Sequence, residues 1–206
     1  MLTHGPAIEA ESFRIIDETL AGRFADPRQQ AIVRRIVHAT ADFDFVENTV
    51  FGPNAIDSGI AALKKGCTIV TDVNMLREGI IQRFIDPFGA KKACYISDAD
   101  LPELAAKEGT TKAVQAMRRA KSQIEGGIVI VGNAPTALYE VIRMVREEGV
   151  RPGLVIGVPV GFVSAEESKD ELMTVDVPWI VCRGKKGGSS VGASAMNALS
   201  LLAAQV

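Results

Sequence analysis

Short apolar runs alternate with helical stripes along the chain, and the clearest run is residues 128–131. It consists of isoleucine and valine between two glycines, which is typical of a strand buried on both faces of a parallel sheet. Asn133 is predicted to cap a helix that follows, and Pro135 suits the first turn of that helix. Apolar positions then recur at helical spacing at Leu138, Val141, Ile142 and Val145. The stretch is therefore predicted to be a strand, a tight turn and a helix.

The same alternation continues through the rest of the sequence. Further helices are predicted over residues 6–20, 53–65, 111–123 and 189–204, with another that starts at Asp26-Pro27, and further strands over residues 67–73, 92–96, 153–159 and 178–183. Strands that alternate with helices in this way indicate a three-layer α/β/α fold with a largely parallel central sheet. No repeat or linker divides the chain, so a single domain of residues 1–206 is expected.

Composition narrows the class of protein and its compartment. Hydrophobic residues make up 47% of the chain and aromatic residues only 5%, which suits an aliphatic core between layers. A net charge of −2 gives no basic field for nucleic acid. There is no apolar run of about 20 residues for a membrane helix, and residues 1–9 lack the basic start and apolar block of a secretory signal. The cysteines are odd in number and form no Cys-x-x-Cys pair, which predicts buried, reduced thiols in a cytoplasmic protein; they are Cys67, Cys94 and Cys182.

Polar or glycine-rich segments follow four of the predicted strands. They are residues 71–72, 132–136, 157–162 and 183–190. The carboxyl ends of parallel strands meet at one edge of the sheet, which is the usual ligand crevice in this fold class. Backbone N–H groups of residues 133–136 would be free to receive an anion there, although an ordinary turn explains the same residues. Nearby cations favour a polyanionic ligand; they are Lys112, Lys169, Arg183, Lys185 and Lys186.

Familiar catalytic signatures are absent, and His38 is the natural acid–base candidate. Residues 132–136 do not form the Gly-x-Gly-x-x-Gly of dinucleotide sites, and residues 184–190 lack the Gly-Lys-Ser/Thr ending of a phosphate loop. Two histidines do not suggest a metal cluster, so no metal is expected. His38 lies about 150° from the centre of the apolar stripe of its helix. On these physical grounds alone, the pattern favours a solvated surface histidine over a catalytic one.

Several motifs in one order resemble those of the precorrin-8X methylmutases, also called cobalt-precorrin-8 methylmutases. The motifs are Ile8-Glu-x-Glu-Ser-Phe13, Val37-His38, Gly132-Asn-Ala-Pro-Thr-Ala-Leu138, Gly157-Val-Pro-Val-Gly-Phe-Val163, Glu167-Ser-Lys169 and Arg183-Gly-x-x-Gly-Gly-Ser189. The resemblance covers nearly the full length. It implies a three-layer α/β homodimer with a large cleft for a tetrapyrrole and no added cofactor. It also implies an isomerase of cobalamin biosynthesis, which moves a methyl group from C11 to C12 of the ring to give hydrogenobyrinate or cobyrinate.

The resemblance assigns roles to individual residues. His38, in its Val-His-Ala context, matches the catalytic histidine, so it is expected to lend a proton to a ring nitrogen near neutral pH. Lys112 stands where the family usually has arginine, which implies looser or different binding of one carboxylate. A non-catalytic tetrapyrrole carrier is the alternative from another class, and a nucleotide-binding enzyme is a remote third. The expected substrate-binding residues are Ser12, Asp72, Lys112, Gly132, Asn133, Thr136, Gly161, Lys169, Gly188 and Ser189.

Overall fold

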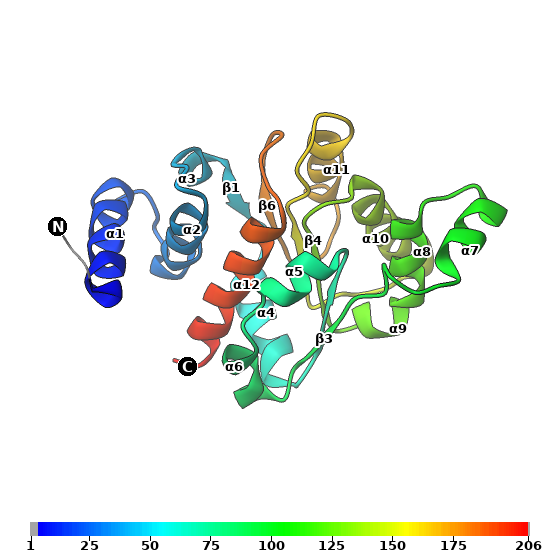
Figure 1. The fold of residues 1–206 in the computed structure, drawn as a ribbon, viewed down its shortest axis with the longest axis horizontal. Helices are drawn as coiled ribbons and strands as arrows, with labels where there is room; N and C mark the ends of the chain where they lie inside the picture. The colour runs from blue at the N-terminus through cyan, green and yellow to red at the C-terminus, as the bar shows by residue number, and fades with distance from the viewer. Residues whose placement is uncertain (1–3, 206) are drawn as a thin grey trace.

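The centre of the molecule is a six-stranded sheet of strand order β1-β6-β5-β4-β2-β3, seen in a computed structural model that describes residues 4–205 (Figure 1). Strands β2 to β6 are parallel to their neighbours, and only the edge strand β1 runs antiparallel, beside β6. The strands are β1 (Thr49–Phe51), β2 (Thr68–Thr71), β3 (Lys91–Ala93), β4 (Ile128–Val131), β5 (Leu154–Gly157) and β6 (Trp179–Cys182). The predicted fold class is therefore confirmed.

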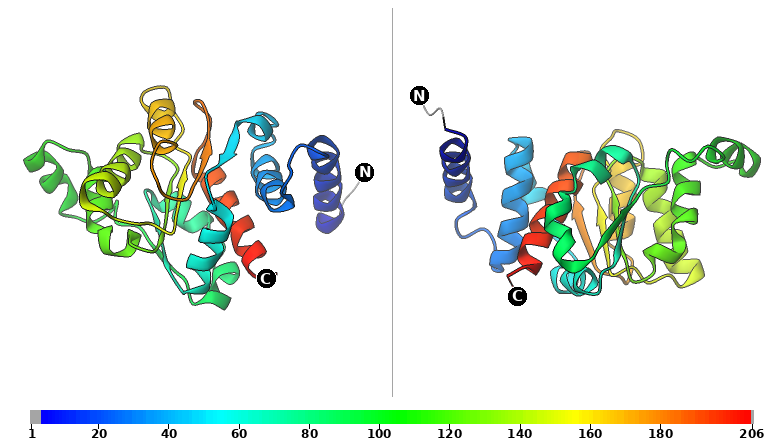
Figure 2. Two further views of the ribbon diagram at one scale, coloured as in Figure 1. Left: turned by 180° about the vertical axis from the view of Figure 1, so that it is seen from behind. Right: turned by 60° about the horizontal axis from the view of Figure 1, so that its bottom comes forward.

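Helices cover both faces of the sheet (Figures 1 and 2). One layer holds α2 (Pro27–Thr40), α4 (Ala55–Lys64), α5 (Asn74–Gly79), α6 (Gln82–Ile85) and α12 (Ser189–Ala203), with α1 (Gly5–Leu20) packed outside α2. The other holds α7 (Leu101–Glu108), α8 (Lys112–Arg119), α9 (Lys121–Ile124), α10 (Pro135–Glu148) and α11 (Ala165–Leu172). Within β4, Ile128 and Ile130 join the first core and Val129 and Val131 the second, because side chains alternate along a strand.

Local chemistry explains where the helices begin. Asp26 caps α2 by accepting a hydrogen bond from the Arg28 N–H, and Pro27 occupies the first turn, as predicted. Helix α10 begins at Pro135, but its N-cap residue is Ala134 without a side-chain cap, so the predicted cap at Asn133 is wrong. The predicted helix over residues 111–123 is divided into α8 and α9 at Ala120. Elements that were not predicted are β1, α3 (Asp44–Asn48), α5, α6, the 3-10 turn η1 (Asp86–Phe88), α7 and α11.

The amino-terminal segment forms the helix predicted over residues 6–20, and this helix begins at Gly5. His4 is the N-cap residue of α1, and its carbonyl accepts hydrogen bonds from the N–H groups of Ala7 and Ile8. Residues 1–3 and 206 of the expected domain, together with the start of the segment compared with a secretory signal, lie outside the described residues. Across residues 4–205, no helix has the length and apolar character needed to cross a membrane.

The strand order determines where a ligand crevice is expected. From β2 the chain moves outward to β3 and then returns to the other side of β2 as β4, so the direction of winding reverses between β2 and β4. In open α/β sheets the crevice lies at the carboxyl ends of the strands at such a reversal. The end of α2, the start of α12 and the loops after β5 and β6 lie at this same edge, at the top of Figure 1.

Candidate active site

The Asp72 side chain lies between the carboxyl ends of β2 and β4, where the direction of winding reverses. The Asp72 carboxylate is fully buried at the end of β2 and accepts hydrogen bonds from three backbone N–H groups. The donors are Gly132 at 3.0 Å, Asn133 at 2.7 Å and Ala134 at 2.8 Å. Burial raises the pKa of Asp72, whereas the three N–H donors act in the opposite direction. These N–H groups are therefore paired with Asp72, and a substrate contact by this buried carboxylate stays a prediction.

Three loops come together beside this buried carboxylate. The Gly161 N–H donates to the Lys185 carbonyl at 3.1 Å, and the Gly188 N–H donates to the Val158 carbonyl at 2.9 Å. Gly132 is buried, and a Cβ added there would lie 3.1 Å from backbone atoms of Ser189. Gly188 has a φ of 120°, which favours glycine. The predicted site positions in these loops thus share one surface, although Gly132 supports it from beneath.

Exposed polar side chains surround these loops at the edge of the sheet. Thr136, at the start of α10, has its Oγ1 atom 3.1 Å from that of Thr111, so the starts of α8 and α10 are adjacent. Asn133, Thr136 and Lys112 are all exposed. Lys185 is exposed as well, with its Nζ atom 5.9 Å from the ring centre of Phe162, whose side chain is 89% exposed. A ligand at this edge therefore meets amide, hydroxyl and ammonium groups.

Two of the predicted cations have other partners. Lys169 on α11 is fully buried, burial lowers its pKa, and its Nζ atom donates to the Lys186 carbonyl at 3.0 Å. The Lys186 Nζ atom lies 2.6 Å from carboxylate oxygens of both Asp42 and Asp44. A substrate contact by Lys169 stays a prediction, since its ammonium is buried against a loop carbonyl. Three of the five cations make no ion pair within residues 4–205 and remain exposed: Lys112, Arg183 and Lys185.

His38 lies in the last turn of α2 and is exposed, as its place off the apolar stripe predicted. Its ring lies 4.5 Å from that of Phe13, centre to centre, with a tilt of 32°. The Arg34 guanidinium lies 3.8 Å from the same Phe13 ring. The Ser12 hydroxyl donates to the Ile8 carbonyl within α1, so Phe13 and not Ser12 is the side chain seen to contact the imidazole.

Sequence analysis missed two contributions to this region. Phe13 belongs to a motif used for the resemblance, but its contact with His38 depends on how α1 packs on α2. Asp42 is four residues beyond His38 and was given no role, although its carboxylate binds Lys186 in the loop after β6. The sequence did contain one signal for this contact: an acidic pair follows directly after the helix that carries the candidate histidine. Its partner, 142 to 144 residues away, was not readable from spacing.

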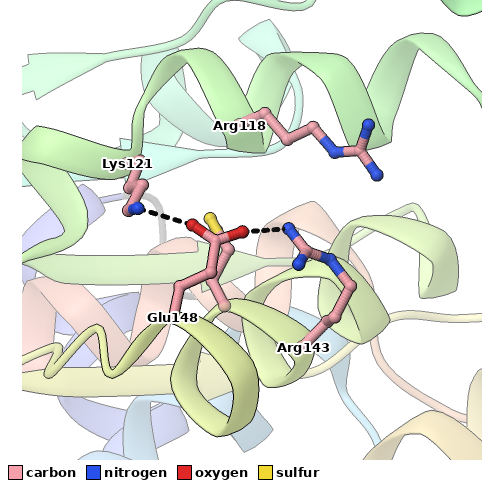
Figure 3. Close-up of a pocket in the computed structure, with 5 residues that line it drawn as sticks. Arg118, Lys121, Arg143 and Glu148 are labelled. Atoms are coloured by element: carbon pink, nitrogen blue, oxygen red, sulfur yellow. Dashed lines mark hydrogen bonds and ion pairs between the residues drawn. The ribbon is translucent and has the colours of Figure 1, made fainter. Parts of the chain in front are cut away.

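A hollow lined by charged side chains lies on the outer helical layer, away from the glycine loops. It has a volume of about 470 Å³ between the α8–α9 segment and α10. Figure 3 shows Glu148 between Lys121 and Arg143, and both cations lie 2.5 Å from its carboxylate oxygens. Arg118 is paired with the buried Glu140; burial raises the pKa of Glu140, but hydrogen bonds from Arg143 and Arg118 outweigh burial and lower it. Because every cation here has a carboxylate partner and the hollow is away from the glycine loops, it is not the candidate site.

Fold and site together define an α/β protein with glycine-containing loops and exposed cations at the carboxyl edge of its sheet, and with an exposed histidine on the helix that Lys186 links to these loops. Comparison with known proteins agrees with this class. The profile of the family described as Precorrin-8X methylmutase matches residues 7–202. A cobalt-precorrin-8 methylmutase of Leptospira interrogans is 43% identical in an alignment of 209 positions that covers 98% of this chain and 95% of the relative. Another, from Priestia megaterium, is 46% identical over 196 residues, which is 95% of this chain and 87% of the relative.

The similarity extends to three dimensions. The solved structure of the precorrin-8x methyl mutase of Thermus thermophilus superimposes with a TM-score of 0.89 at 40% identity, covering 98% of this chain and 97% of that one. The chain belongs to the precorrin-8X methylmutase family. The resemblance noted from the sequence is thereby confirmed, and with it the assignment to a family of isomerases.

Proposed function

We propose that this protein moves a methyl group from C11 to C12 of precorrin-8X or cobalt-precorrin-8 in cobalamin biosynthesis. The observation that carries the proposal is the near-complete coverage of the chain by relatives named for this reaction. All the loops of the candidate site lie inside the matched residues 7–202. The substrate is a large ring with carboxylate side chains, which suits an open edge with exposed cations.

In the proposed mechanism His38 is a general acid. The imidazolium lends a proton to a ring nitrogen, and the conjugated electrons redistribute so that the C11–methyl bond breaks as the C12–methyl bond forms. The nitrogen then returns the proton, so that substrate and product are isomers and no net proton is consumed. The exposure of His38 supports this role, because a proton donor must reach the ring from the rim of the crevice.

Substrate binding is assigned to seven members of the predicted set, of which Lys112, Asn133 and Thr136 are exposed. These three residues lie at the starts of α8 and α10. Gly161 lies in the loop after β5, the buried Gly188 lies in the loop after β6, and Ser189 begins α12. Ser12 is proposed as a contact beside His38 from α1. The buried residues Asp72, Gly132 and Lys169 shape these loops from behind. No cofactor is proposed, because the shift is intramolecular and proton transfer suffices.

Lys112→Ala should weaken product binding by roughly 1–2 kcal/mol if its ammonium meets a substrate carboxylate. Its exposure and its position next to the Thr111–Thr136 contact support this assignment. Calorimetric titration with hydrogenobyrinate measures the change, and Lys107→Ala on α7 removes another exposed lysine as a control. An unchanged dissociation constant for Lys112→Ala removes this residue from the site.

The protein is also proposed to act as a homodimer in the cytoplasm. Ile8 and Ile15 of α1 are each 47% exposed, and a two-fold contact would cover such side chains. A stable contact should bury about 1,200 Å² or more in total. Sedimentation at micromolar concentration should show twice the 22.0 kDa chain mass, and a single species at 22.0 kDa contradicts the dimer. The three unpaired cysteine thiols support the cytoplasmic location.

Absorption spectra with the two candidate substrates test the reaction and its alternative. Conversion changes the conjugation of the ring and hence its spectrum, whereas a non-catalytic carrier binds the ring without that change. Metal-free precorrin-8X and its cobalt-bearing counterpart should be tested side by side, since relatives are named for each. Failure of both rings to change their spectra in the presence of the protein contradicts the proposal.

A further inference from the structure

Residues 184–188, in the loop after β6, are held by contacts to two separate helical regions. The Lys186 carbonyl accepts from the buried Lys169 ammonium of α11, at 3.0 Å. The Lys186 side chain reaches the opposite way, to Asp42 and Asp44 beyond the end of α2. One residue therefore connects the helix after β5 with the helix that carries His38.

We propose that Lys186, acting through Asp42 and Asp44, is a positioning residue that fixes the last turn of α2, and so His38, against the glycine loops. This role rests on the proposed function of His38. It assigns Lys186 to the protein's own geometry and not to a substrate carboxylate.

The acidic pair is preorganised to receive this lysine. Asp42 Oδ1 accepts the Asp44 N–H at 2.9 Å, and the Asp42 N–H lies 3.3 Å from the Thr40 hydroxyl oxygen. The other Asp42 oxygen is thereby presented to the Lys186 Nζ atom at 2.6 Å. Ala41 has a φ of 53°, in the left-handed region, so the chain turns sharply between His38 and this pair. Because the turn is short, holding Asp42 in place also restrains the position of His38.

The ion pair favours the charged forms of Asp42 and Lys186. The hydrogen bond from Lys186 lowers the pKa of Asp42, and the two carboxylates raise the pKa of Lys186. Exposed ion pairs contribute little to global stability, and the Asp44 side chain is 66% exposed. The consequence of the link is therefore local: it determines where α2 ends relative to the loop after β6.

Substitutions at both ends of the link test this role. Lys186→Met, the Asp42→Asn/Asp44→Asn pair and the combined triple variant should each lower kcat by roughly tenfold or more, because small displacements of a reacting group are costly. Product affinity should stay within about twofold. The triple variant should be no slower than either parent, since both remove the same interaction. Hydrogen exchange over residues 37–44 and 184–188 should increase in all three.

Arg28→Met is the matched control, because Arg28 bridges Asp26 and Asp57 at the opposite end of the same helix. Its kcat should stay within about twofold of the wild-type value. An unchanged kcat in Lys186→Met, with an active wild type, overturns the positioning role and leaves the proposed function intact. A loss of product affinity in Lys186→Met, or additive losses in the triple variant, also overturns it by assigning Lys186 to direct ligand contact. An inactive wild type contradicts the proposed function and this inference together.

Discussion

The His38→Ala variant should keep its fold, and its turnover should fall by about 10²- to 10⁴-fold. This is the usual contribution of a positioned proton donor to the rate. The imidazole is exposed, and its recorded ring contact is with Phe13 on α1, so its removal leaves both cores intact. Product affinity should change much less, because the glycine loops and exposed cations supply most of the binding.

Steady-state rates and product titration of the same preparation separate these effects. His4→Ala is the matched control, because His4 lies at the start of α1 and its side chain makes no cap hydrogen bond. Its turnover should equal that of the wild type. Near-wild-type turnover in His38→Ala refutes the general-acid role while leaving the crevice and its ligand in place.

Asp72→Asn should lower the free energy of unfolding by about 2–5 kcal/mol. The carboxylate accepts three backbone N–H groups in a fully buried position. Asparagine has a single acceptor oxygen, and its NH₂ group would face N–H donors. At least one buried donor then loses its partner, and each such loss costs about 1–3 kcal/mol. The expected effect is therefore on the fold of the loop after β4 and on stability.

Urea unfolding followed by circular dichroism measures the change. Asp57→Asn is a control, since its carboxylate is 65% exposed and pairs with Arg28; its effect should be about 1 kcal/mol or less. If Asp72→Asn keeps wild-type stability and loses product affinity, Asp72 contacts the substrate after all, as the sequence alone suggested.

Local patterns in the sequence were sufficient for the elements that carry the core. The run at residues 128–131 and the stripe after it predicted β4 and α10, because burial on two faces and helical spacing are local properties. Strand β1 was missed for the opposite reason. It has three residues and forms a strand only because it pairs with β6, where Val50 lies opposite Val181. Such a partner cannot be read from the residues around it.

The same distinction applies to the site. Asp72 and Lys169 were placed at the correct edge of the sheet, but their charges were assumed to face solvent. Asp72 instead accepts hydrogen bonds from N–H groups that are 60 to 62 residues away in the sequence. Lys169 donates a hydrogen bond to the carbonyl of Lys186, 17 residues away. Family motifs identified which residues matter without showing whether each one binds a ligand or supports the loop that does.

Turnover of a ring labelled with ¹³C in its C11 methyl group tests the central claim most directly. The protein should be incubated with a large molar excess of metal-free or cobalt-bearing precorrin-8, and the products analysed by carbon NMR. The proposed function predicts that the labelled methyl resonance moves to that of C12 in many rings per protein molecule. A label that remains on C11 in both rings, with no more than one ring bound per subunit, would contradict a methylmutase and identify a carrier.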